Sequence, residues 1–390
     1  MNILFLLKTC EIGGIGIVTS VLANQFVSKG YKVTVVSFLE PPTKMLKKFH
    51  HGIKTISLGK YVYNKDNIKK LRDVLISENI DIIINQLGLP FMPIRVINKA
   101  KMGLNIKVIS VYHNQINTNG KIMAVDQAIM LCNDSVKIFA LKIKRFAVKF
   151  VTSYSMKYVY KHSDVYEVLS PSFVDLFKKF TGIENPNKLV VQTNPITIDN
   201  ESWSFSQKQK EVIYVGRLDF VQKRVYRVID TWNYLEQFFP DWKLTIVGDG
   251  DDRQNLENQV KNLKLKNVIF TGFQDPIKYY KRASILLLTS DFKGFPLVLP
   301  ECMNFGVIPV VYNSYSAVGD IIDNGKNGII IPYNKKGYQA EVSAKMLASI
   351  MNDSVKQKEM ALSAIEKSRK FSIEKICGEW ESIFEKLCMS

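Results

Sequence analysis

The stretch ASILLLTSDFKGFPLVLPEC, residues 283–302, contains the unit from which the whole chain is built. The run ASILLLT is apolar and of strand length, which predicts a buried strand. SDFKGFP has the glycine and proline of a loop, and the segment after it predicts a helix that stops at NFG, residues 304–306. A buried strand joined to a helix by a loop is the repeating unit of a helix-covered parallel sheet.

The same alternation of short apolar runs and longer helical patterns extends in both directions. The predicted strands of the first half are NILFLL (2–7), YKVTVVSF (31–38), IDIIINQ (80–86), IKVISVY (106–112), DVYEVLS (164–170) and LVVQTN (189–194). Those of the second half are EVIYVGR (211–217), WKLTIVGD (242–249), NVIFTG (267–272), ASILLLT (283–289), VIPVVY (307–312) and GIIIP (328–332). Strands separated by helices imply right-handed crossovers and a mainly parallel sheet. The predicted fold class is therefore α/β, with two Rossmann-like doubly wound parallel-sheet domains.

The domain boundaries follow from a break in the alternation. PITIDNESWSFSQKQKE, residues 195–211, is polar and without period, which predicts a linker. The predicted parts are an N-terminal domain over 1–197, a linker over 198–210, a C-terminal domain over 211–370 and a C-terminal helix over 371–390. That helix has apolar residues at helical spacing and must dock on another part of the chain. We expect the ligand in a cleft where the carboxyl ends of the two sets of strands face each other.

The composition is that of a folded soluble protein. Of 390 residues, 46% are hydrophobic and 23% are charged, as in ordinary globular domains. No window reaches the roughly 18 apolar residues that a membrane-spanning helix needs, and the apolar run after Asn2 lacks the basic leader and cleavage site of a signal peptide. The five cysteines are scattered without a C-x-x-C pair, so neither a disulfide framework nor a zinc site is indicated. We expect a cytoplasmic protein.

The net charge of +17 has two explanations that the sequence leaves open. Only 9 of the 53 basic residues are arginine, which together with abundant asparagine and isoleucine is typical of an AT-biased genome. Alternatively, the charge serves an anionic partner. Nucleic acid is disfavoured, because no RNP-like, zinc-finger or basic-zipper signature is present. The segment 137–161 instead carries seven basic residues and no acidic one, which predicts a basic amphipathic helix at an anionic membrane surface.

A glycine-rich turn, TCEIGGIG at residues 9–16, follows the first predicted strand and opens a helix. Glycines there let backbone N–H groups approach an anion, and the helix N-terminus adds partial positive charge. The dinucleotide-binding fingerprint is incomplete because Thr19 stands where its third glycine belongs, although Glu40 after the second strand keeps a nicotinamide cofactor open. A plain strand-to-helix turn is the third possibility.

YVGRLDFVQKR, residues 214–224, places Arg217 and Lys223 after the first strand of the second domain. Arginine offers a planar fork of donors and lysine a mobile charge, so together they suit a diphosphate, although two solvated basic residues would look the same.

In the next block, Asp249 and Asp251 stand where a strand turns into a helix. Acidic residues favour the first turn of a helix, so we expect no metal there.

The opening stretch contributes one lysine, Lys293, and one carboxylate, Glu301. If the helix begins near Leu297, the backbone N–H groups of Leu297 and Val298 point toward the ligand. Glu301 then lies about one turn further along and faces the same way, where it can accept hydrogen bonds from a diol such as ribose. A solvated glutamate on a helix surface is the alternative.

Five blocks between residues 212 and 332 stand in the order and spacing of a known family. They are VGRLDFVQK, LTIVGDGDDR, NVIFTGF, LLLTSDFKGFPLVLPECMNFGVIPVV and DIIDNGKNGIIIP. The first half adds its glycine turn, VYHN at 111–114, VLSPS at 168–172 and TNPI at 193–196. Over nearly its whole length the chain resembles family 4 of the retaining, nucleotide-sugar-dependent glycosyltransferases. The resemblance implies the GT-B fold, with the acceptor side in the N-terminal domain, the donor site in the C-terminal domain, and a C-terminal helix that returns to the N-terminal domain.

The resemblance also implies roles for individual residues. The predicted catalytic residues are Arg217, Lys223 and His113. The predicted donor-binding residues are Gly13, Gly14, Gly216, Gly272, Phe273, Lys293, Gly294, Phe295, Leu297, Val298 and Glu301. The two cations would hold the donor diphosphate, the paired glycines would close over it, and the histidine would lie close to the transferred sugar. The glutamate would hold the ribose, beside a base bordered by the backbone at 272–273. No metal or cofactor is implied.

Lys293 departs from the family pattern. The family has E-x7-E across this loop, whereas this chain has K-x7-E, with Lys293 in place of the first glutamate. Three interpretations remain open. Lys293 recognises a sugar that bears a negative group, or it adds a third cation at the phosphates while Asp291 replaces the lost carboxylate. In the third interpretation the chain binds nucleotide sugar but transfers it poorly or not at all.

The predicted function is transfer of a hexose from a nucleotide sugar, of UDP type, to a lipid-linked or cell-surface polysaccharide precursor. Retention of configuration by front-face attack needs leaving-group stabilisation and alignment more than a nucleophile. The enzyme would be peripheral at the inner face of the membrane. Two alternatives stay open: a catalytically impaired, nucleotide-sugar-binding partner subunit of a glycosyltransferase complex, and a nicotinamide-dependent oxidoreductase.

Overall fold

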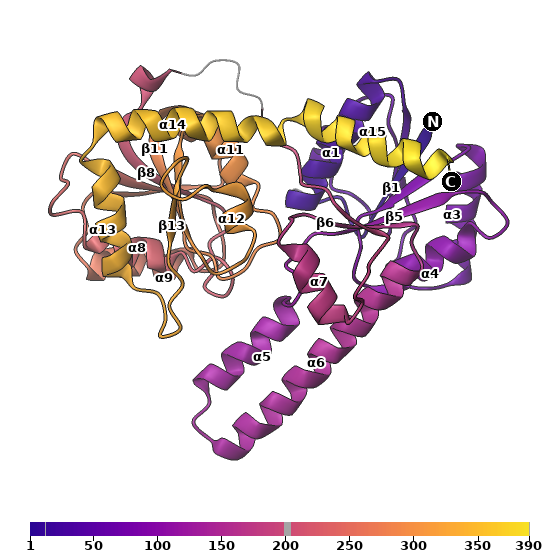
Figure 1. The fold of residues 1–390 in the computed structure, drawn as a ribbon, viewed down its shortest axis with the longest axis horizontal. Coiled ribbons are helices and arrows are strands. Elements are labelled where there is room, and N and C mark those ends of the chain that lie inside the picture. Colours follow the sequence, from indigo (N-terminus) through magenta and orange to yellow (C-terminus); the bar gives the residue numbers. More distant parts are fainter. Residues whose placement is uncertain (12, 199–203, 390) are drawn as a thin grey trace. The chain divides into compact units, whose positions relative to one another are not determined.

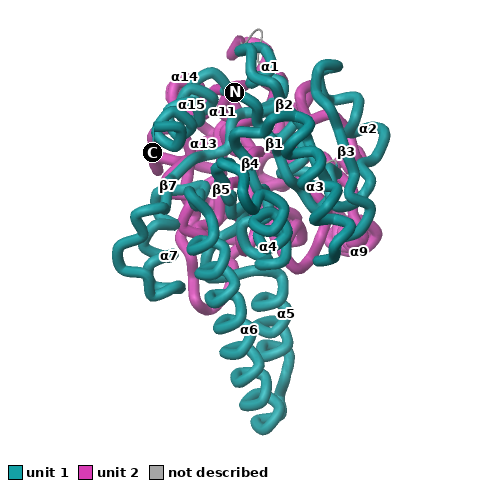
Figure 2. The backbone as a smooth tube through the Cα atoms, turned by 90° about the vertical axis from the view of Figure 1, so that its right-hand side faces the viewer, with its two compact units in different colours: residues 1–197, 373–390 teal, residues 198–372 magenta. Residues whose placement is uncertain are grey.

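The computed structural model describes residues 1–11, 13–198 and 204–389. The chain forms two compact units, the first made of residues 1–197 and 373–390 and the second of residues 198–372 (Figure 2). Each unit contains one parallel sheet covered by helices (Figure 1). The predicted fold class, two doubly wound parallel-sheet domains, is confirmed.

Unit 1 has a seven-stranded sheet in the order β3-β2-β1-β4-β5-β6-β7, and each neighbouring pair is parallel. Its strands are β1 (Asn2–Leu7), β2 (Lys32–Ser37), β3 (Lys54–Ser57), β4 (Ile82–Asn85), β5 (Lys107–Tyr112), β6 (Val165–Val168) and β7 (Leu189–Val191). The strand β3 was not predicted. Its sequence, KTIS, is short and lies at the sheet edge with no buried residue, so it lacks the continuous apolar run of an interior strand.

The helices of unit 1 are α1 (Gly14–Ser28), α2 (Thr43–Leu46), α3 (Lys65–Ser77), α4 (Phe91–Ala100), α5 (Gly120–Leu131), α6 (Ser135–Lys161), α7 (Phe173–Thr181) and α15 (Ile373–Met389). Side chains of Asn64, Asn119 and Asp134 cap the starts of α3, α5 and α6 by accepting backbone N–H groups. At the other end, Gly182 takes the left-handed conformation that terminates α7.

The C-terminal helix α15 packs on α1 of the same unit. The rings of Trp380 and Phe384 lie 6.5 Å and 5.4 Å from that of Phe26, measured between centroids. An ion pair of 2.5 Å between Lys29 and Glu381 borders this aromatic cluster. Burial of large aromatic side chains against α1 is what ties the end of the chain to its beginning.

Unit 2 has a six-stranded sheet in the order β10-β9-β8-β11-β12-β13, again parallel throughout. Its strands, all predicted, are β8 (Gln209–Val215), β9 (Lys243–Val247), β10 (Val268–Gly272), β11 (Ala283–Leu288), β12 (Ile308–Tyr312) and β13 (Ile329–Ile331). Its helices are α8 (Tyr226–Asn233), α9 (Arg253–Asn262), α10 (Ile277–Arg282), α11 (Val298–Asn304), α12 (Val318–Ile321), α13 (Ala340–Met351) and α14 (Ser354–Ser368), with 3₁₀ turns at Phe205–Gln207 and Arg369–Phe371.

The region predicted as a linker is only partly described. Residues 199–203 of it lie outside the described residues, and residues 205–207 form a 3₁₀ turn. Residues 209 and 210 already belong to β8.

Both sheets reverse their strand order at one point. In unit 1 this point lies between β1 and β4, and in unit 2 between β8 and β11. Loops that leave neighbouring strands on opposite faces of a sheet open a crevice at such a switch point, where α/β proteins bind ligands. The glycine turn follows β1, Arg217 and Lys223 follow β8, and Lys293 follows β11. The topology therefore brings the candidate residues of each unit to one place.

One carboxyl group in unit 1 is fully buried without a hydrogen-bond partner in the part of the chain that the structure describes. Glu167 lies in β6, fully buried and paired in register with Val111 and Val190. Neither of its carboxylate oxygens has a hydrogen-bond partner among the described residues. Burial raises the pKa of Glu167 well above its ordinary value. The folded unit therefore favours the neutral acid.

Glu167→Met is expected to increase the free energy of unfolding by about 1–3 kcal/mol, because it removes two buried, unpaired oxygens. The gain should grow as the pH rises above about 4.5, since an unfolded glutamate ionises there whereas the folded one is held neutral. Chemical denaturation at several pH values measures this. Glu211→Met is the matched control: Glu211 is an equally buried strand residue, but Thr245 and Arg282 donate hydrogen bonds to it, so that change should destabilise.

Candidate functional site

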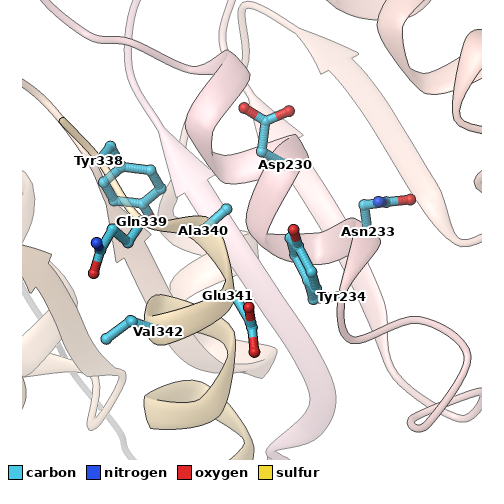
Figure 3. Close-up of a pocket in the computed structure, with 8 residues that line it drawn as sticks. All are labelled: Asp230, Asn233, Tyr234, Tyr338, Gln339, Ala340, Glu341 and Val342. Carbon is cyan, nitrogen blue, oxygen red and sulfur yellow. The ribbon is translucent and has the colours of Figure 1, made fainter. Parts of the chain in front are cut away.

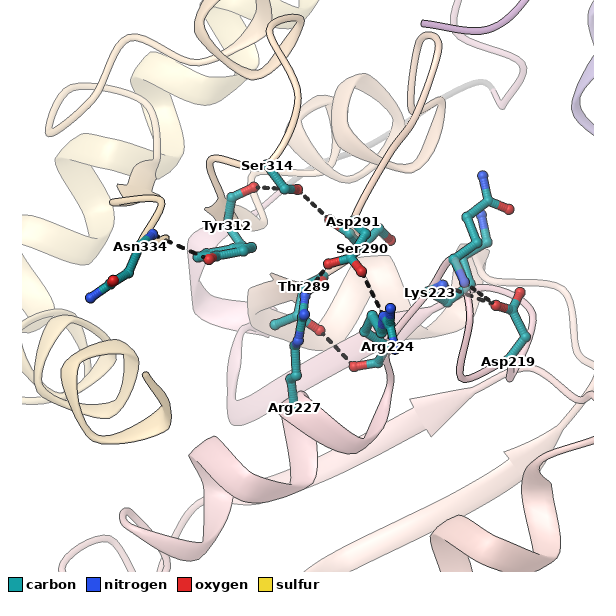
Figure 4. Close-up of polar contacts among 11 residues, drawn as sticks. Asp219, Lys223, Arg224, Arg227, Thr289, Ser290, Asp291, Tyr312, Ser314 and Asn334 are labelled. Atoms are coloured by element: carbon teal, nitrogen blue, oxygen red, sulfur yellow. Dashed lines mark hydrogen bonds and ion pairs between the residues drawn. The ribbon is translucent and has the colours of Figure 1, made fainter. Parts of the chain in front are cut away.

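Asp219 organises the loop after β8. Its Oδ1 accepts the backbone N–H groups of Gln222, at 2.6 Å, and Lys223, at 3.0 Å (Figure 4). Its Oδ2 pairs with the guanidinium of Arg217 at 2.9 Å. Burial opposes ionisation of Asp219, but these hydrogen bonds outweigh it, so its pKa lies below the ordinary value. Arg217 itself is largely exposed, although its Nε and Nη2 are paired with Asp219.

Glycines allow this loop to lie against the loop after β9. Gly248 has φ of +143°, and a Cβ atom there would lie 1.9 Å from the carbonyl oxygen of Gly216. A Cβ on Gly250 would lie 2.3 Å from the carbonyl oxygen of Leu218. Larger residues at either position would push the loop that carries Arg217 out of place.

Lys223 and Lys293 meet at the switch point of unit 2. Their side chains are partly buried and lie close enough for each amine to affect the pKa of the other. No carboxylate of the described chain lies within ion-pair distance of either lysine. Burial lowers the pKa of both amines, and the charge of Lys223 lowers that of Lys293 further, to well below its ordinary value. Two ammonium groups in contact repel each other, so a bound anion is what would allow both to stay charged.

Asp291 is occupied by two arginines. Its Oδ2 pairs with Arg224 Nε at 2.6 Å, and its Oδ1 pairs with Arg227 Nη1 (Figure 4). Arg224 adopts left-handed backbone angles with φ of +52°, which few residues other than glycine do. Arg227 also donates to the carbonyl of Thr289 at 3.1 Å. With both oxygens paired, Asp291 is poorly placed to replace the missing family glutamate.

The surroundings of this ion-pair network hold further polar groups. The guanidinium of Arg227 lies 5.3–5.8 Å from the ring centroids of Tyr226, Tyr312 and Tyr338. The buried hydroxyl of Ser290, next to Asp291, has no hydrogen-bond partner among the described residues. The sequence singled out none of these residues except Asp291. Only their position around the ends of β8, β11 and β12 connects them with the two lysines.

Glu301 lies in the first turn of α11, as predicted, but it is 6% exposed rather than solvated. The hydroxyl of Tyr280 lies 3.5 Å from its Oε2. Leu297 and Val298 stand at the start of α11 and are partly exposed. Phe295, in contrast, turns into the unit, where its ring lies 5.4 Å from that of Phe371.

The positions expected near a base differ in exposure. Gly272 is buried at the end of β10, with φ of +71°, and Phe273 after it is 74% exposed. The acids of the neighbouring block have protein partners: Asp249 Oδ1 accepts from Gly250 N–H, and Asp252 Oδ2 accepts from Phe220 N–H. No group of three or more histidines, cysteines or acids that could hold a metal occurs among the described residues.

In unit 1 the candidate residues lie at the ends of β1 and β5. Gly13 is the N-cap of α1, and a Cβ added there would meet nothing within 4 Å. Gly16 is different, since a Cβ there would lie 2.1 Å from the carbonyl oxygen of Glu11. The glycine at 13 is thus not required by packing, whereas that at 16 is.

His113 follows β5 and meets a residue that the sequence did not suggest. Its Nε2 lies 2.5 Å from Oε1 of Gln86, which follows β4. Because an amide oxygen only accepts, the imidazole donates from Nε2. Burial lowers the pKa of His113 to about 4. The imidazole is therefore neutral at physiological pH, and Gln86 fixes its orientation.

A pocket of about 570 Å³ lies elsewhere in unit 2, between α8 and the start of α13 (Figure 3). Its lining residues are Asp230, Asn233, Tyr234, Tyr338, Gln339, Ala340, Glu341 and Val342. None of the predicted site residues is among them. The carboxylates of Asp230 and Glu341 would repel a phosphate, so this pocket is not the expected anion site.

Both halves of the chain match known protein families. Residues 12–200 match the family described as Glycosyltransferase Family 4, and residues 196–371 match Glycosyl transferases group 1. An uncharacterised glycosyltransferase of Haemophilus influenzae is 25% identical over 97% of this chain and 98% of its own length.

Two further proteins are similar. A Campylobacter jejuni enzyme named GalNAc-alpha-(1->4)-GalNAc-alpha-(1->3)-diNAcBac-PP-undecaprenol alpha-1,4-N-acetyl-D-galactosaminyltransferase is 29% identical over 57% of this chain and 60% of its own. The structure of Anabaena Alr3699/HepE in complex with UDP-glucose superposes with a TM-score of 0.75 at 17% identity, covering 99% of this chain and 100% of that one.

Lys293→Met is expected to stabilise the ligand-free protein by roughly 1–2 kcal/mol, because it removes one of two buried like charges. An unfolded lysine is protonated below about pH 10.5, whereas the folded environment of Lys293 opposes protonation, so the wild type loses stability as the pH falls below that value. The increase in the free energy of unfolding caused by Lys293→Met should therefore be present at pH 7 and vanish near pH 11. Thermal denaturation across this range measures it. Lys345→Met, at an exposed position in α13, is the control and should change stability little. A destabilised Lys293→Met protein would contradict the electrostatic description of the pair.

Proposed function

We propose that this chain, which belongs to glycosyltransferase family 4 and has the GT-B fold, transfers a hexose-type sugar with retention from a UDP-linked donor. The acceptor is a lipid-linked or cell-surface polysaccharide precursor. The observation that carries the proposal is the meeting of Lys223 and Lys293 beside Arg217 at the switch point of unit 2. Three cations with only one carboxylate among them call for a doubly charged ligand.

A nucleoside diphosphate fits this arrangement. The exposed fork of Arg217 can bind phosphate oxygens in pairs, while the two lysines act as point charges. Desolvation penalises both lysines until an anion arrives, so much of the electrostatic gain is realised only on binding. Glu301 is then the acceptor for the ribose hydroxyls, and exposed Phe273 borders the base.

In unit 1, the open backbone at Gly13 and the N-terminus of α1 provide a second place for a phosphate. His113, neutral and oriented by Gln86, serves as a hydrogen-bonding partner for the transferred sugar rather than as an acid. Arg217 and Lys223 offset the negative charge that develops on the departing diphosphate, without a metal. The diphosphate oxygen released from the sugar then takes the proton of the acceptor hydroxyl, which attacks from the same face.

Of the three interpretations of Lys293, we favour a third cation at the phosphates. Lys293 lies near Lys223, which the diphosphate assignment already uses. Replacement of the family glutamate by Asp291 is disfavoured, because Arg224 and Arg227 occupy both of its oxygens.

The acceptor class and the location rest on relatives and on charge. The Campylobacter relative acts on a polyprenyl-diphosphate-linked glycan, by its name, and a Salmonella typhimurium relative, 32% identical over 35% of this chain, is named a lipopolysaccharide 1,6-galactosyltransferase. A net charge of +17 suits work at the inner, anionic face of a membrane. The nicotinamide alternative is abandoned, because both halves match glycosyltransferase families. A catalytically impaired partner subunit remains the second candidate, favoured by the loss of the family glutamate at 293.

Arg217→Ala and Lys223→Ala should each lower kcat/KM by about 100- to 1000-fold, or about 3–4 kcal/mol of transition-state stabilisation. Both should also weaken UDP binding in titration calorimetry. Lys210→Ala is the control: Lys210 lies on the same strand, β8, at its other end, and its loss should leave both quantities unchanged. Equal kcat/KM in wild type and both site variants would refute the assignment.

Lys293→Glu, which restores the family residue, distinguishes the interpretations when nucleotide sugars are screened for slow hydrolysis. If Lys293 binds the phosphates, UDP binding should fall by about tenfold or more whatever the sugar, since a repulsive charge replaces an attractive one. A loss confined to donors with acidic sugars would instead make Lys293 a sugar-recognition residue. Tight UDP binding with no turnover of any donor, in wild type and variant alike, would favour the partner-subunit alternative.

A further inference from the structure

The helices α5 and α6 form an antiparallel hairpin that projects from the sheet of unit 1 (Figures 1 and 2). The buried residues of α6 all lie at or beyond Thr152, where the helix packs on α4 and α7. The part of α6 before Thr152, residues 135–151, is about 25 Å long at 1.5 Å per residue and has only α5 beside it in both views.

Residues 135–151 of α6 expose a regular apolar stripe. Its members are Val136, Phe139, Ile143, Phe146 and Phe150, with exposed fractions of 78%, 66%, 56%, 73% and 64%. They follow one another at alternating spacings of three and four residues, which places them on one face of the helix. Met130 and Leu131, 81% and 76% exposed, continue the apolar surface at the tip of the hairpin.

This stripe is not the contact with α5. The half-buried residues Ile138, Leu141, Arg145 and Val148 lie on the opposite side of α6, and Arg145 pairs with Asp126 of α5. Large aromatic side chains in contiguous exposed patches generally mark an interaction surface. The fold of the chain therefore leaves a row of three phenylalanines without a cover.

The charges beside the stripe indicate what covers it. By the helical period, Lys142 and Lys149 flank the stripe on one side, whereas Lys144 and Lys137 lie further round the helix on the other side, beyond Ala147 and Ala140. α6 contains no acidic residue. The hairpin's two acids are engaged within it: Asp126 pairs with Arg145, and Asp134 caps the start of α6.

A second copy of the chain fits this surface poorly. Packing two such stripes together would bring lysines from both copies to the same seam with no carboxylate opposite them, and like charges across a helical seam select against pairing. A membrane with anionic headgroups satisfies both features, since phenylalanines enter the acyl boundary while lysine stems reach back to the phosphates. No described helix is long and apolar enough to cross a bilayer.

We propose that the α5–α6 hairpin is a membrane-inserting element, which seats the stripe from Val136 to Phe150 in the interface of an anionic bilayer with its lysines at the headgroups. This proposal rests on the proposed function for its biological setting. It assigns the membrane contact to one surface of the chain, and it attributes the contact to insertion of apolar side chains rather than to overall charge. The hairpin would hold the acceptor side of unit 1 at the surface where lipid-linked glycans lie.

The test uses the full-length protein and sedimentation with vesicles, either phosphatidylglycerol mixed with phosphatidylcholine or phosphatidylcholine alone. Wild type should bind the mixed vesicles at low salt. The variant Phe139→Gln, Phe146→Gln, Phe150→Gln should lose binding at every salt concentration. The variant Lys137→Gln, Lys142→Gln, Lys144→Gln should bind about a hundredfold more weakly, since each surface lysine contributes roughly fivefold. Phe238→Gln, at a 70% exposed position of unit 2, should bind as wild type does.

A second measurement separates insertion from surface attraction. Phe146→Trp places an indole in the stripe, and its fluorescence should be quenched by brominated acyl chains beyond any change seen in wild type. Absence of that extra quenching, or full vesicle binding by the phenylalanine variant, would overturn the proposal. A wild-type dimer in sedimentation equilibrium that is lost in the phenylalanine variant, with no vesicle binding by either, would also overturn it in favour of a contact between copies.

Donor hydrolysis in the absence of vesicles keeps the two proposals apart. Because the hairpin carries none of the proposed donor-binding residues, both triple variants should hydrolyse UDP-sugar within about twofold of wild type. Vesicle binding without turnover would leave the hairpin proposal standing and the catalytic one refuted. Turnover without vesicle binding would do the reverse.

Discussion

Two carboxylates determine how positive charge is distributed at the ligand edge of unit 2. Asp219 and Asp291 pair with the arginines that surround them and fasten the loops after β8 and β11. Lys223 and Lys293 are left facing each other without a carboxylate of their own. The ion pairs of the arginines thus maintain the shape of the site, while the positive charge of the two lysines is available to bind an anion. The proposed diphosphate site depends on this division, since neutralising all five cations internally would leave nothing to bind the donor.

The sheet topology makes the division possible. β8 and β11 are neighbours although two other strands separate them in the chain, and the order of strands reverses there. Gly248 and Gly250 let the loop after β9 approach the loop after β8 at distances that no side chain would allow. Unit 1 repeats the arrangement at β1 and β4, but with a different chemical character: an open glycine, a glutamine and a neutral histidine. The two switch points therefore differ in chemistry, with cationic side chains in unit 2 and neutral polar groups in unit 1.

The exposed apolar surface of the α5–α6 hairpin in unit 1 is not explained by donor binding. The hairpin presents aromatic side chains to solvent with lysines on both sides, although burying them would stabilise an isolated protein. The C-terminal part of α6 packs on α4 and α7, and the projecting part packs on α5. The proposed seating of the hairpin in an anionic bilayer would account for this exposure.

The sequence by itself determined the fold class, the positions of nearly all strands and the family. These rest on local patterns: continuous apolar runs identify buried parallel strands, and ordered motif blocks identify the family. It missed β3, because an exposed edge strand has no apolar run. It marked Lys293 as unusual and the segment 137–161 as basic. Tertiary structure alone decided that Lys293 meets Lys223, that Asp291 is taken by two arginines, that Glu167 is buried without a partner, and that the phenylalanines of α6 face outward. Each of these depends on which distant segments become neighbours, which sheet order sets and no local pattern contains.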